Sequence, residues 1–276
     1  RQILGPGQLA LIKAIPIYMK AEIAFSDSYR IYSDMFDFAV DLTPKPDYSL
    51  IQETIALVGD FLAVRGQTLR PFSLEIRGKM EREGKKFGLG SSGSVVVLVL
   101  KALLALYDIT VDPELLFKLA SAVLLKRGDN GSMGDLACIV AEDLVLYQSF
   151  NRKKVATWLK EESLATVLKR DWGFSISHVQ PALECAFLVG WTKEVAVSSQ
   201  MVQQIKQNIN QNFLSSSKAT VFALVEALEH GNAEKIIEQV ETASQLLEGL
   251  SPDIYTPSLR QLKEASQDLQ AVAKSS

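Results

Sequence analysis

The sequence predicts an α+β protein of two domains, a β-rich first domain followed by a helical second one. Two observations support this prediction. The alternation of apolar and polar residues that is typical of strands is concentrated in residues 9–76. Helical spacing of apolar residues dominates after residue 199. Residues 171–181 read as the passage between the domains, so we expect domains of residues 1–180 and 181–276.

The composition is that of an ordinary globular protein. The 276 residues are 47% hydrophobic and 22% charged, and the net charge is −3, which gives no electrostatic case for nucleic acid or an anionic membrane. No apolar run reaches the roughly 18 residues that a spanning helix needs. Cys138 and Cys185 fit neither a disulfide framework nor a metal motif. With no signal peptide expected either, these features predict a cytoplasmic protein without nucleic-acid or membrane partners.

The strands are expected in the first 80 residues. Leu9–Phe25 alternates apolar and polar residues and reads as one strand with a bulge or edge at Pro16. A turn leads to a second strand, Tyr29–Tyr32, and Phe72–Ile76 alternates cleanly as a half-buried strand. One later strand is expected at Glu184–Val189.

The helices begin at recognisable signals. Ser49 is the expected cap of a helix to Arg65, and Asp112-Pro113 starts a helix to about Arg127. Residues 92–107 are apolar nearly all round, which predicts a central buried helix. The other expected helices are Leu136 to about Phe150, Ala156–Lys169, Ser199–Asn212, Lys218–His230, Ala233–Leu250 and Ser258–Lys274.

A loop of glycines and serines precedes the central helix, in the run Lys85-Lys86-Phe87-Gly88-Leu89-Gly90-Ser91-Ser92-Gly93-Ser94. Its glycines let the backbone approach a ligand closely. The free N–H groups and positive dipole end of the following helix favour an anion, most plausibly phosphate. The alternative is a loop that only begins a buried helix and binds nothing. Loop chemistry alone leaves both interpretations open.

A second small-residue loop, Gly128–Asp135, also leads into an apolar helix. Ser132 and Asp135 have the spacing of a capping pair, in which the hydroxyl and the carboxylate serve the start of the helix. This structural interpretation stands beside a catalytic one for Asp135.

The pattern G-L-G-S-S-G-S resembles the second motif of the GHMP kinases, the superfamily of galactose, homoserine, mevalonate and phosphomevalonate kinases. The resemblance implies an N-terminal ATP-binding domain, a ferredoxin-like C-terminal domain, and substrates bound in the cleft between them. It implies ATP and Mg²⁺ as cofactors, with Ser92 as a metal ligand. The residues that it implies for nucleotide binding are Gly88, Leu89, Gly90, Ser91, Ser92, Gly93 and Ser94.

The resemblance extends to the second loop, where Ser132 and Asp135 match a family motif of the type P-S-G-x-D. It implies that Asp135 is catalytic, either accepting the proton of the acceptor oxygen or holding its charge partner. Sugar- and mevalonate-type members add a glutamate about eleven residues earlier, where this chain has Leu124. The second Mg²⁺ ligand therefore stays open.

Four cations, Lys85, Lys86, Lys126 and Arg127, flank the two loops, which favours an acceptor that is itself phosphorylated. For Lys126 and Arg127, a solvated helix end is a good alternative. Within the superfamily the two loops look most like those of bacterial phosphomevalonate kinases. That resemblance implies ATP-dependent phosphorylation of 5-phosphomevalonate, with substrate-binding residues Lys86, Ser132 and Arg127. Mevalonate or another small alcohol as acceptor, or nucleotide binding without turnover, are the alternatives.

Two family motifs are not found: a lysine-bearing segment expected before Pro6, and a glycine-rich segment expected after residue 276. We therefore expect that both ends are shortened, and that these residues alone bind nucleotide but turn over poorly.

Overall fold

The computed structural model describes residues 5–78, 81–82, 85–86, 90–129, 131–190, 205, 208–268 and 271–275. The chain forms two compact units that interleave in sequence. Unit 1 comprises residues 1–12, 144–149 and 174–276, and unit 2 comprises residues 13–143 and 150–173. The mixture of helices and sheets agrees with the predicted α+β class. The expected boundary between residues 180 and 181 refers to family domains and stays a prediction.

Unit 2 is built on a three-stranded sheet of order β2-β4-β3, formed by Lys20–Phe25, Phe72–Arg77 and Arg30–Ser33. Strand β2 runs antiparallel to β4 and β3 runs parallel to it, and both place an isoleucine opposite Leu74. Along β4, the side chains of Phe72, Leu74 and Ile76 are fully buried, and the residues between them are less so. This alternation confirms the predicted strand at residues 72–76 and gives the sheet one covered face.

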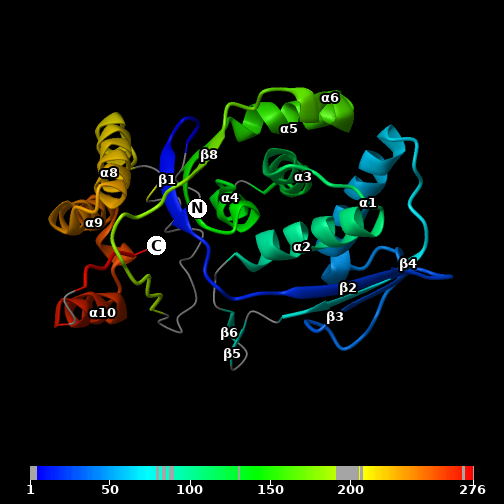
Figure 1. Ribbon diagram of the computed structural model, residues 1–276, viewed down its shortest axis with the longest axis horizontal. Coiled ribbons are helices and arrows are strands. Elements are labelled where there is room, and N and C mark those ends of the chain that lie inside the picture. Colours follow the sequence, from blue (N-terminus) through cyan, green and yellow to red (C-terminus); the bar gives the residue numbers. More distant parts are fainter. Residues whose placement is uncertain are drawn as a thin grey trace. The chain divides into compact units, whose positions relative to one another are not determined.

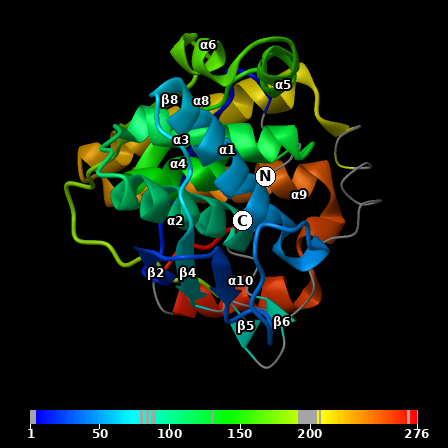
Figure 2. The same ribbon diagram turned by 90° about the vertical axis from the view of Figure 1, so that its right-hand side faces the viewer.

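Helices cover that face in layers. Helix α2 (Ser91–Leu106) contacts β2, and α1 (Ser49–Val64), α3 (Pro113–Lys126) and α4 (Gly134–Ala141) all contact α2. Both views place α2 between the sheet and α3, with α5 (Arg152–Glu161) and α6 (Leu164–Lys169) beyond α3 (Figures 1 and 2). The burial of α2, with Val96, Val99 and Leu100 at 0% exposure, confirms the predicted central helix. Its buried side is held by contacts with β2, α1, α3 and α4, whereas Lys101 and Ala105 are exposed.

Capping side chains mark where three helices of unit 2 begin. The expected cap of α1 is wrong, because Ser49 is the first residue of that helix, Tyr48 is its N-cap residue and no side chain caps it. The Asp112 carboxylate accepts a hydrogen bond of 2.7 Å from the Leu115 N–H, so the expected Asp-Pro start of α3 is confirmed. Asn151 and Ser163 cap α5 and α6 in the same way. The expected helix Ala156–Lys169 is therefore two helices, because Ser163 starts a new one. The short elements of unit 2 are η1 (Pro46–Tyr48), β5 (Glu81–Arg82) and β6 (Lys85–Lys86).

Unit 1 contains a second three-stranded sheet, of order β1-β7-β8, formed by Leu9–Lys13, Leu144–Gln148 and Ser175–His178. Helices α8 (Gln211–Glu229), α9 (Ala233–Leu250), η2 (Pro252–Ile254) and α10 (Pro257–Asp268) lie in the described part of unit 1. Leu144 and Val179 from the sheet region pack with Val225 and Leu228 of α8 and form a hydrophobic core in unit 1. Helices α8 and α9 form a hairpin that turns at Gly231, where φ is +67°. None of the helices in the described parts of the chain is long and apolar enough to cross a membrane.

Several expected elements are wrong. The expected strand Leu9–Phe25 is two strands in different sheets, because Pro16 interrupts the pairing. The expected helix from Leu136 to about Phe150 ends at Ala141, where Glu142 takes a left-handed conformation with φ +59°. Residues 144–148 instead form β7, which pairs antiparallel with β8.

After residue 183, one expected strand is wrong and one expected helix is confirmed. Glu184–Val189 forms no regular element, and the side chains of Phe187, Leu188 and Val189 are exposed. The expected strand is therefore wrong. The expected helix Ser199–Asn212 falls largely outside the described residues, whereas Ala233–Leu250 is confirmed with the same bounds.

We predict that Val99→Ala in α2 lowers the free energy of unfolding of the protein by about 2 kcal/mol, since it removes two buried methyl groups and leaves a cavity. Val64→Ala is the matched control, because Val64 is 59% exposed at the end of α1. It should change stability by less than about 0.5 kcal/mol. Denaturant unfolding followed by circular dichroism measures both, and equal losses would contradict the assigned burial of α2.

Candidate active site

The N-terminus of α2 is open toward an anion. Gly90 is its N-cap residue, with φ +84° and ψ +30°, and no side chain among the described residues caps the helix there. The Gly90 carbonyl accepts hydrogen bonds from the Ser94 N–H (3.0 Å) and the Ser94 hydroxyl (3.3 Å), which closes the first turn. The first N–H groups of a helix have no partner within it, and the dipole makes this end positive. The side chain of Ser92 is exposed at this end, so its hydroxyl is accessible to a ligand.

The loop before α4 is tightly turned. The Asp129 carboxylate accepts a hydrogen bond of 2.6 Å from the Gly131 N–H, and the Ser132 hydroxyl accepts one of 3.3 Å from the Gly134 N–H. Met133 adopts a left-handed conformation with φ +63°, although its side chain is buried. Such a conformation is costly for a residue with a side chain and is concentrated at functional sites.

The two loops meet at Gly93 and Asp135. A Cβ atom on Gly93 would lie 3.1 Å from Asp135 Oδ2 and 3.1 Å from Leu136 Cδ2. The Asp135 carboxylate therefore lies against the first turn of α2, where the helix offers its N–H groups. An anion bound at that turn would be close to a carboxylate, and the two would repel each other unless a cation lay with them. The geometry thus places a carboxylate beside the helix N-terminus that we expect to bind an anion.

The expected capping pair is out of register. Met133 is the N-cap residue of α4, so Ser132 precedes the cap and Asp135 is the second residue of the helix. Asp135 still lies in the first turn, where a negative charge is favourable. Its side chain is half-buried rather than directed fully into solvent.

The three predicted substrate-binding residues lie in different surroundings. Arg127 forms an ion pair of 2.7 Å with Glu53 and donates to the Ser49 hydroxyl at 3.3 Å, which ties the end of α3 to α1. Ser132 is buried in the turned loop at 5% exposure. Lys86 lies in β6, where only the backbone is described. The role of each in substrate binding stays a prediction.

Some residues of the predicted site lie outside the described residues. Two features of the observed site were not predicted. Gly88 and Leu89 are among the residues that the structure does not describe. Leu124 is buried at 5% exposure, and its aliphatic side chain has no donor for a metal ion. Among the described residues, no group of three histidine, cysteine, aspartate or glutamate side chains is placed to hold a metal ion. The left-handed conformation of Met133 and the contact of Gly93 with Asp135 were not predicted. For that contact, the only signal in the sequence is a glycine, Gly93, inside a helical run.

Comparison with known proteins identifies relatives for this arrangement. Residues 49–142, which include both loops, match the family model of the GHMP kinases N terminal domain. A solved Streptococcus pneumoniae phosphomevalonate kinase, in complex with phosphomevalonate and AMPPNP, is 85% identical, with 99% of this chain and 83% of that chain covered and a TM-score of 0.95.

More distant relatives share the fold. The phosphomevalonate kinase of Streptomyces sp. (strain CL190) is 28% identical over 237 residues, and the match covers 82% of this chain and 63% of that protein. This chain therefore spans less than two thirds of that relative. The solved mevalonate kinase of Methanococcus jannaschii is 15% identical with a TM-score of 0.65, covering 95% of this chain and 78% of that chain, which is a likeness of fold alone.

We predict that Gly90→Ala destabilises the protein by about 1–2 kcal/mol, because a Cβ atom disfavours the left-handed conformation. Gly59→Ala in α1 is the matched control: its backbone is helical, and an added Cβ would meet nothing closer than Leu69 Cδ2 at 4.0 Å. It should be neutral or stabilising by up to about 1 kcal/mol. Thermal and denaturant unfolding of both variants measures this difference. Equal stabilities would mean that Gly90 does not hold the left-handed turn at the start of α2.

Proposed function

The chain belongs to the GHMP kinases, and we propose that it is a phosphomevalonate kinase, which transfers the γ-phosphoryl group of ATP to 5-phosphomevalonate and forms 5-diphosphomevalonate for isoprenoid synthesis. The observation that carries this proposal is the contact between the first turn of α2 and Asp135. The 85% identity to an enzyme solved with phosphomevalonate and AMPPNP supports both substrates. A cytoplasmic location belongs to the same proposal.

ATP is proposed to bind with its phosphates at the N-terminus of α2. The uncapped first turn after Gly90 offers several N–H donors at the positive end of the helix dipole. The segment Gly88–Ser94 would wrap the phosphates as it does in the family. Because α2 is buried along its length, these donors are held in place before the nucleotide arrives, which is the condition for electrostatic stabilisation of a transferring group.

The residues present fit Mg²⁺, since the Asp135 carboxylate and the exposed Ser92 hydroxyl are the oxygen donors that this cation prefers. We assign these two residues to hold it, with phosphate oxygens and water completing its shell. When bound, the cation neutralises charge on the phosphate oxygens. This assignment also explains why a carboxylate lies beside an anion site without preventing anion binding.

The acceptor determines what Asp135 has to do. A phosphate monoester loses its second proton with a pKa of about 6, so most of the phosphomevalonate is a dianion at neutral pH. Its oxygen can attack the γ-phosphorus without a base, while the bond to the bridging oxygen breaks and ADP leaves with the electron pair. Of the two roles considered for Asp135, holding the cationic partner is therefore favoured over accepting a proton.

Lys86, Ser132 and Arg127 are proposed to bind the acceptor phosphate. Arg127 retains donors for this role, because a guanidinium has five N–H groups and the contacts to Glu53 and Ser49 involve only some of them. Ser132 lies three residues before Asp135, on the same turned loop. Its buried hydroxyl would position the loop as well as the substrate.

The direct test is a coupled assay of ADP release with phosphomevalonate and mevalonate as separate acceptors. We expect turnover with phosphomevalonate and a kcat/KM at least about tenfold lower with mevalonate, since the cations near the loops favour a phosphorylated acceptor. Equal use of both acceptors would contradict the assignment of the substrate. ATP binding without ADP release on either acceptor would indicate a nucleotide-binding protein without turnover.

We predict that Asp135→Asn lowers kcat by about 10²-fold or more, because the carboxylate that holds the cation is lost. The Mg²⁺ concentration needed for half-maximal rate should rise. The rate should still fall below pH of about 6 in both forms, because the acceptor phosphate becomes protonated there. Steady-state kinetics across pH and Mg²⁺ concentration measure these effects.

Asp60→Asn is the matched control, because Asp60 is exposed on α1 and pairs with Lys126 at 3.6 Å. It should leave kcat within about twofold of the parent, since it removes only an exposed ion pair. If the acid limb of the pH profile vanished in Asp135→Asn, Asp135 would be the base and the proposed role would be wrong. Near-normal turnover with a large loss of stability would favour a purely structural role.

A further inference from the structure

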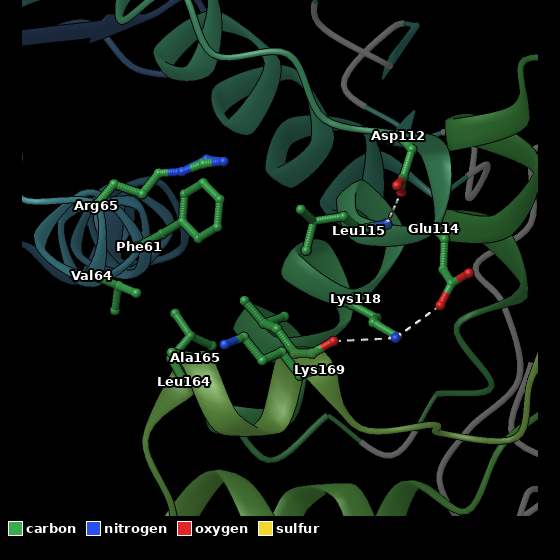
Figure 3. A pocket seen from close by; sticks show the side chains of 11 residues that line it. Phe61, Val64, Arg65, Asp112, Glu114, Leu115, Lys118, Leu164, Ala165 and Lys169 are labelled. Carbon is green, nitrogen blue, oxygen red and sulfur yellow. Dashed lines mark hydrogen bonds and ion pairs between the residues drawn. The ribbon is translucent and has the colours of Figure 1, made fainter.

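A groove of about 490 Å³ lies within unit 2, away from the two loops, and is open to solvent (Figure 3). It is formed by the end of α1, the beginning of α3 and the length of α6, and we call it the α1–α3–α6 groove. Its volume is in the range of small-molecule sites, which is about 300–1,000 Å³. The GHMP-kinase loops do not contribute to it.

The body of the groove is apolar. Phe61 and Val64 of α1 face Leu115 of α3 and Leu164 of α6 across the hollow. Leu168 of α6 also lines it. Val64 is 59% exposed, although it is a large aliphatic side chain on a helix. Apolar surface left in a concave site is a favourable place for an aliphatic chain.

The acidic residues of the groove are already engaged. The Asp112 carboxylate caps α3 by accepting the Leu115 N–H, and Glu114 forms an ion pair of 2.8 Å with Lys118. The Lys118 ammonium also donates to the carbonyl oxygens of Leu168 (3.2 Å) and Arg170 (3.1 Å), so it joins α3 to the end of α6. The Glu114–Lys118 pair cancels its own charges, whereas Asp112 keeps its negative charge at the start of α3. Arg65, Lys118 and Lys169 against Asp112 and Glu114 leave the lining with a net charge of +1.

Two cations remain at the groove. Arg65 extends from the end of α1 with its guanidinium carbon 4.9 Å from the ring centre of Phe61, and Lys169 extends from the end of α6. In Figure 3 both side chains reach over the hollow from opposite elements. Within the described part of the chain, neither Arg65 nor Lys169 forms an ion pair with a carboxylate. The charge available to a ligand is therefore positive.

The groove is distant from the candidate active site along α3. It contains the first turn of this 14-residue helix, whereas the loop with Ser132 follows the last turn. A helix of that length spans about 21 Å. A ligand in the groove would therefore occupy a place separate from the phosphates at α2.

We propose that the α1–α3–α6 groove binds an amphipathic organic anion, with its aliphatic tail on Phe61, Leu115 and Leu164 and its carboxylate or phosphate head between Arg65 and Lys169. The tail supplies most of the affinity, since each buried methylene is favourable. The two cations select the sign of the head group. The proposal does not depend on the kinase activity of the protein.

Octanoate, octanol and octylammonium, three unbranched probes with eight carbon atoms each, test the proposal. Titrations followed by methyl NMR and calorimetry should show octanoate binding most tightly and octylammonium most weakly. Binding shifts should fall on the methyl groups of Val64, Leu115 and Leu164. Absence of octanoate binding, or tighter binding of octylammonium, would overturn the proposal.

The double variant Arg65→Glu/Lys169→Glu should weaken octanoate binding by about tenfold, because two attractive contacts become repulsive. Lys153→Glu/Lys160→Glu on α5 is the matched control, with the same change in net charge at exposed positions outside the groove. It should leave binding within about twofold. Equal weakening in both would mean that net charge, and not the groove, attracts the probe.

Filling the groove gives an independent readout. Ala165 lines it from α6 and is half-buried, so Ala165→Leu places three more carbon atoms in the hollow on a residue that favours helix. Octanoate and octanol should both bind more weakly, with the preference for octanoate retained. Unchanged affinity for both probes in the folded variant would place their binding elsewhere and overturn the proposal.

Discussion

The burial of α2 is the constraint on which the rest of the structure depends. A helix that is apolar on nearly every side is stable only in an interior, and here the sheet, α1, α3 and α4 all contact it. Such a helix can neither rotate nor slide without exposing apolar surface or creating cavities. Its N-terminus is therefore fixed, and so are the N–H groups that begin after Gly90. The geometry of the proposed active site therefore follows from packing, before any ligand is considered.

The same packing brings the second loop into place. Helix α4 contacts α2, and the absence of a side chain at Gly93 leaves room for the Asp135 carboxylate. A larger residue at position 93 would displace either the carboxylate or Leu136. The anion site and the carboxylate are thus parts of one contact between two helices. Neither would have its proposed chemical role without the other.

Strong local periodicity made much of this fold predictable from the sequence. The alternation of residues 72–76 predicts β4, and the Asp112-Pro113 start predicts α3 with its cap. The resemblance to a kinase motif located both loops. What could not be predicted depends on partners distant in sequence: that residues 144–148 pair with β8 rather than extend α4, and that Arg127 meets Glu53. The contact between Gly93 and Asp135 is of the same kind, since no local pattern encodes a distance between two helices.

The interleaving of the two units has a consequence for the order in which the chain is made. Strand β1 is synthesised before unit 2, but its neighbour β7 follows more than 130 residues later, after most of unit 2. At about 5–20 residues per second, that delay lasts on the order of 7–30 s on the ribosome. Throughout it, β1 presents an unpaired edge while the sheet and helices of unit 2 can already assemble beside the exit tunnel. Nascent chains should therefore engage chaperones through residues 9–13, and release should follow the emergence of residues 144–178.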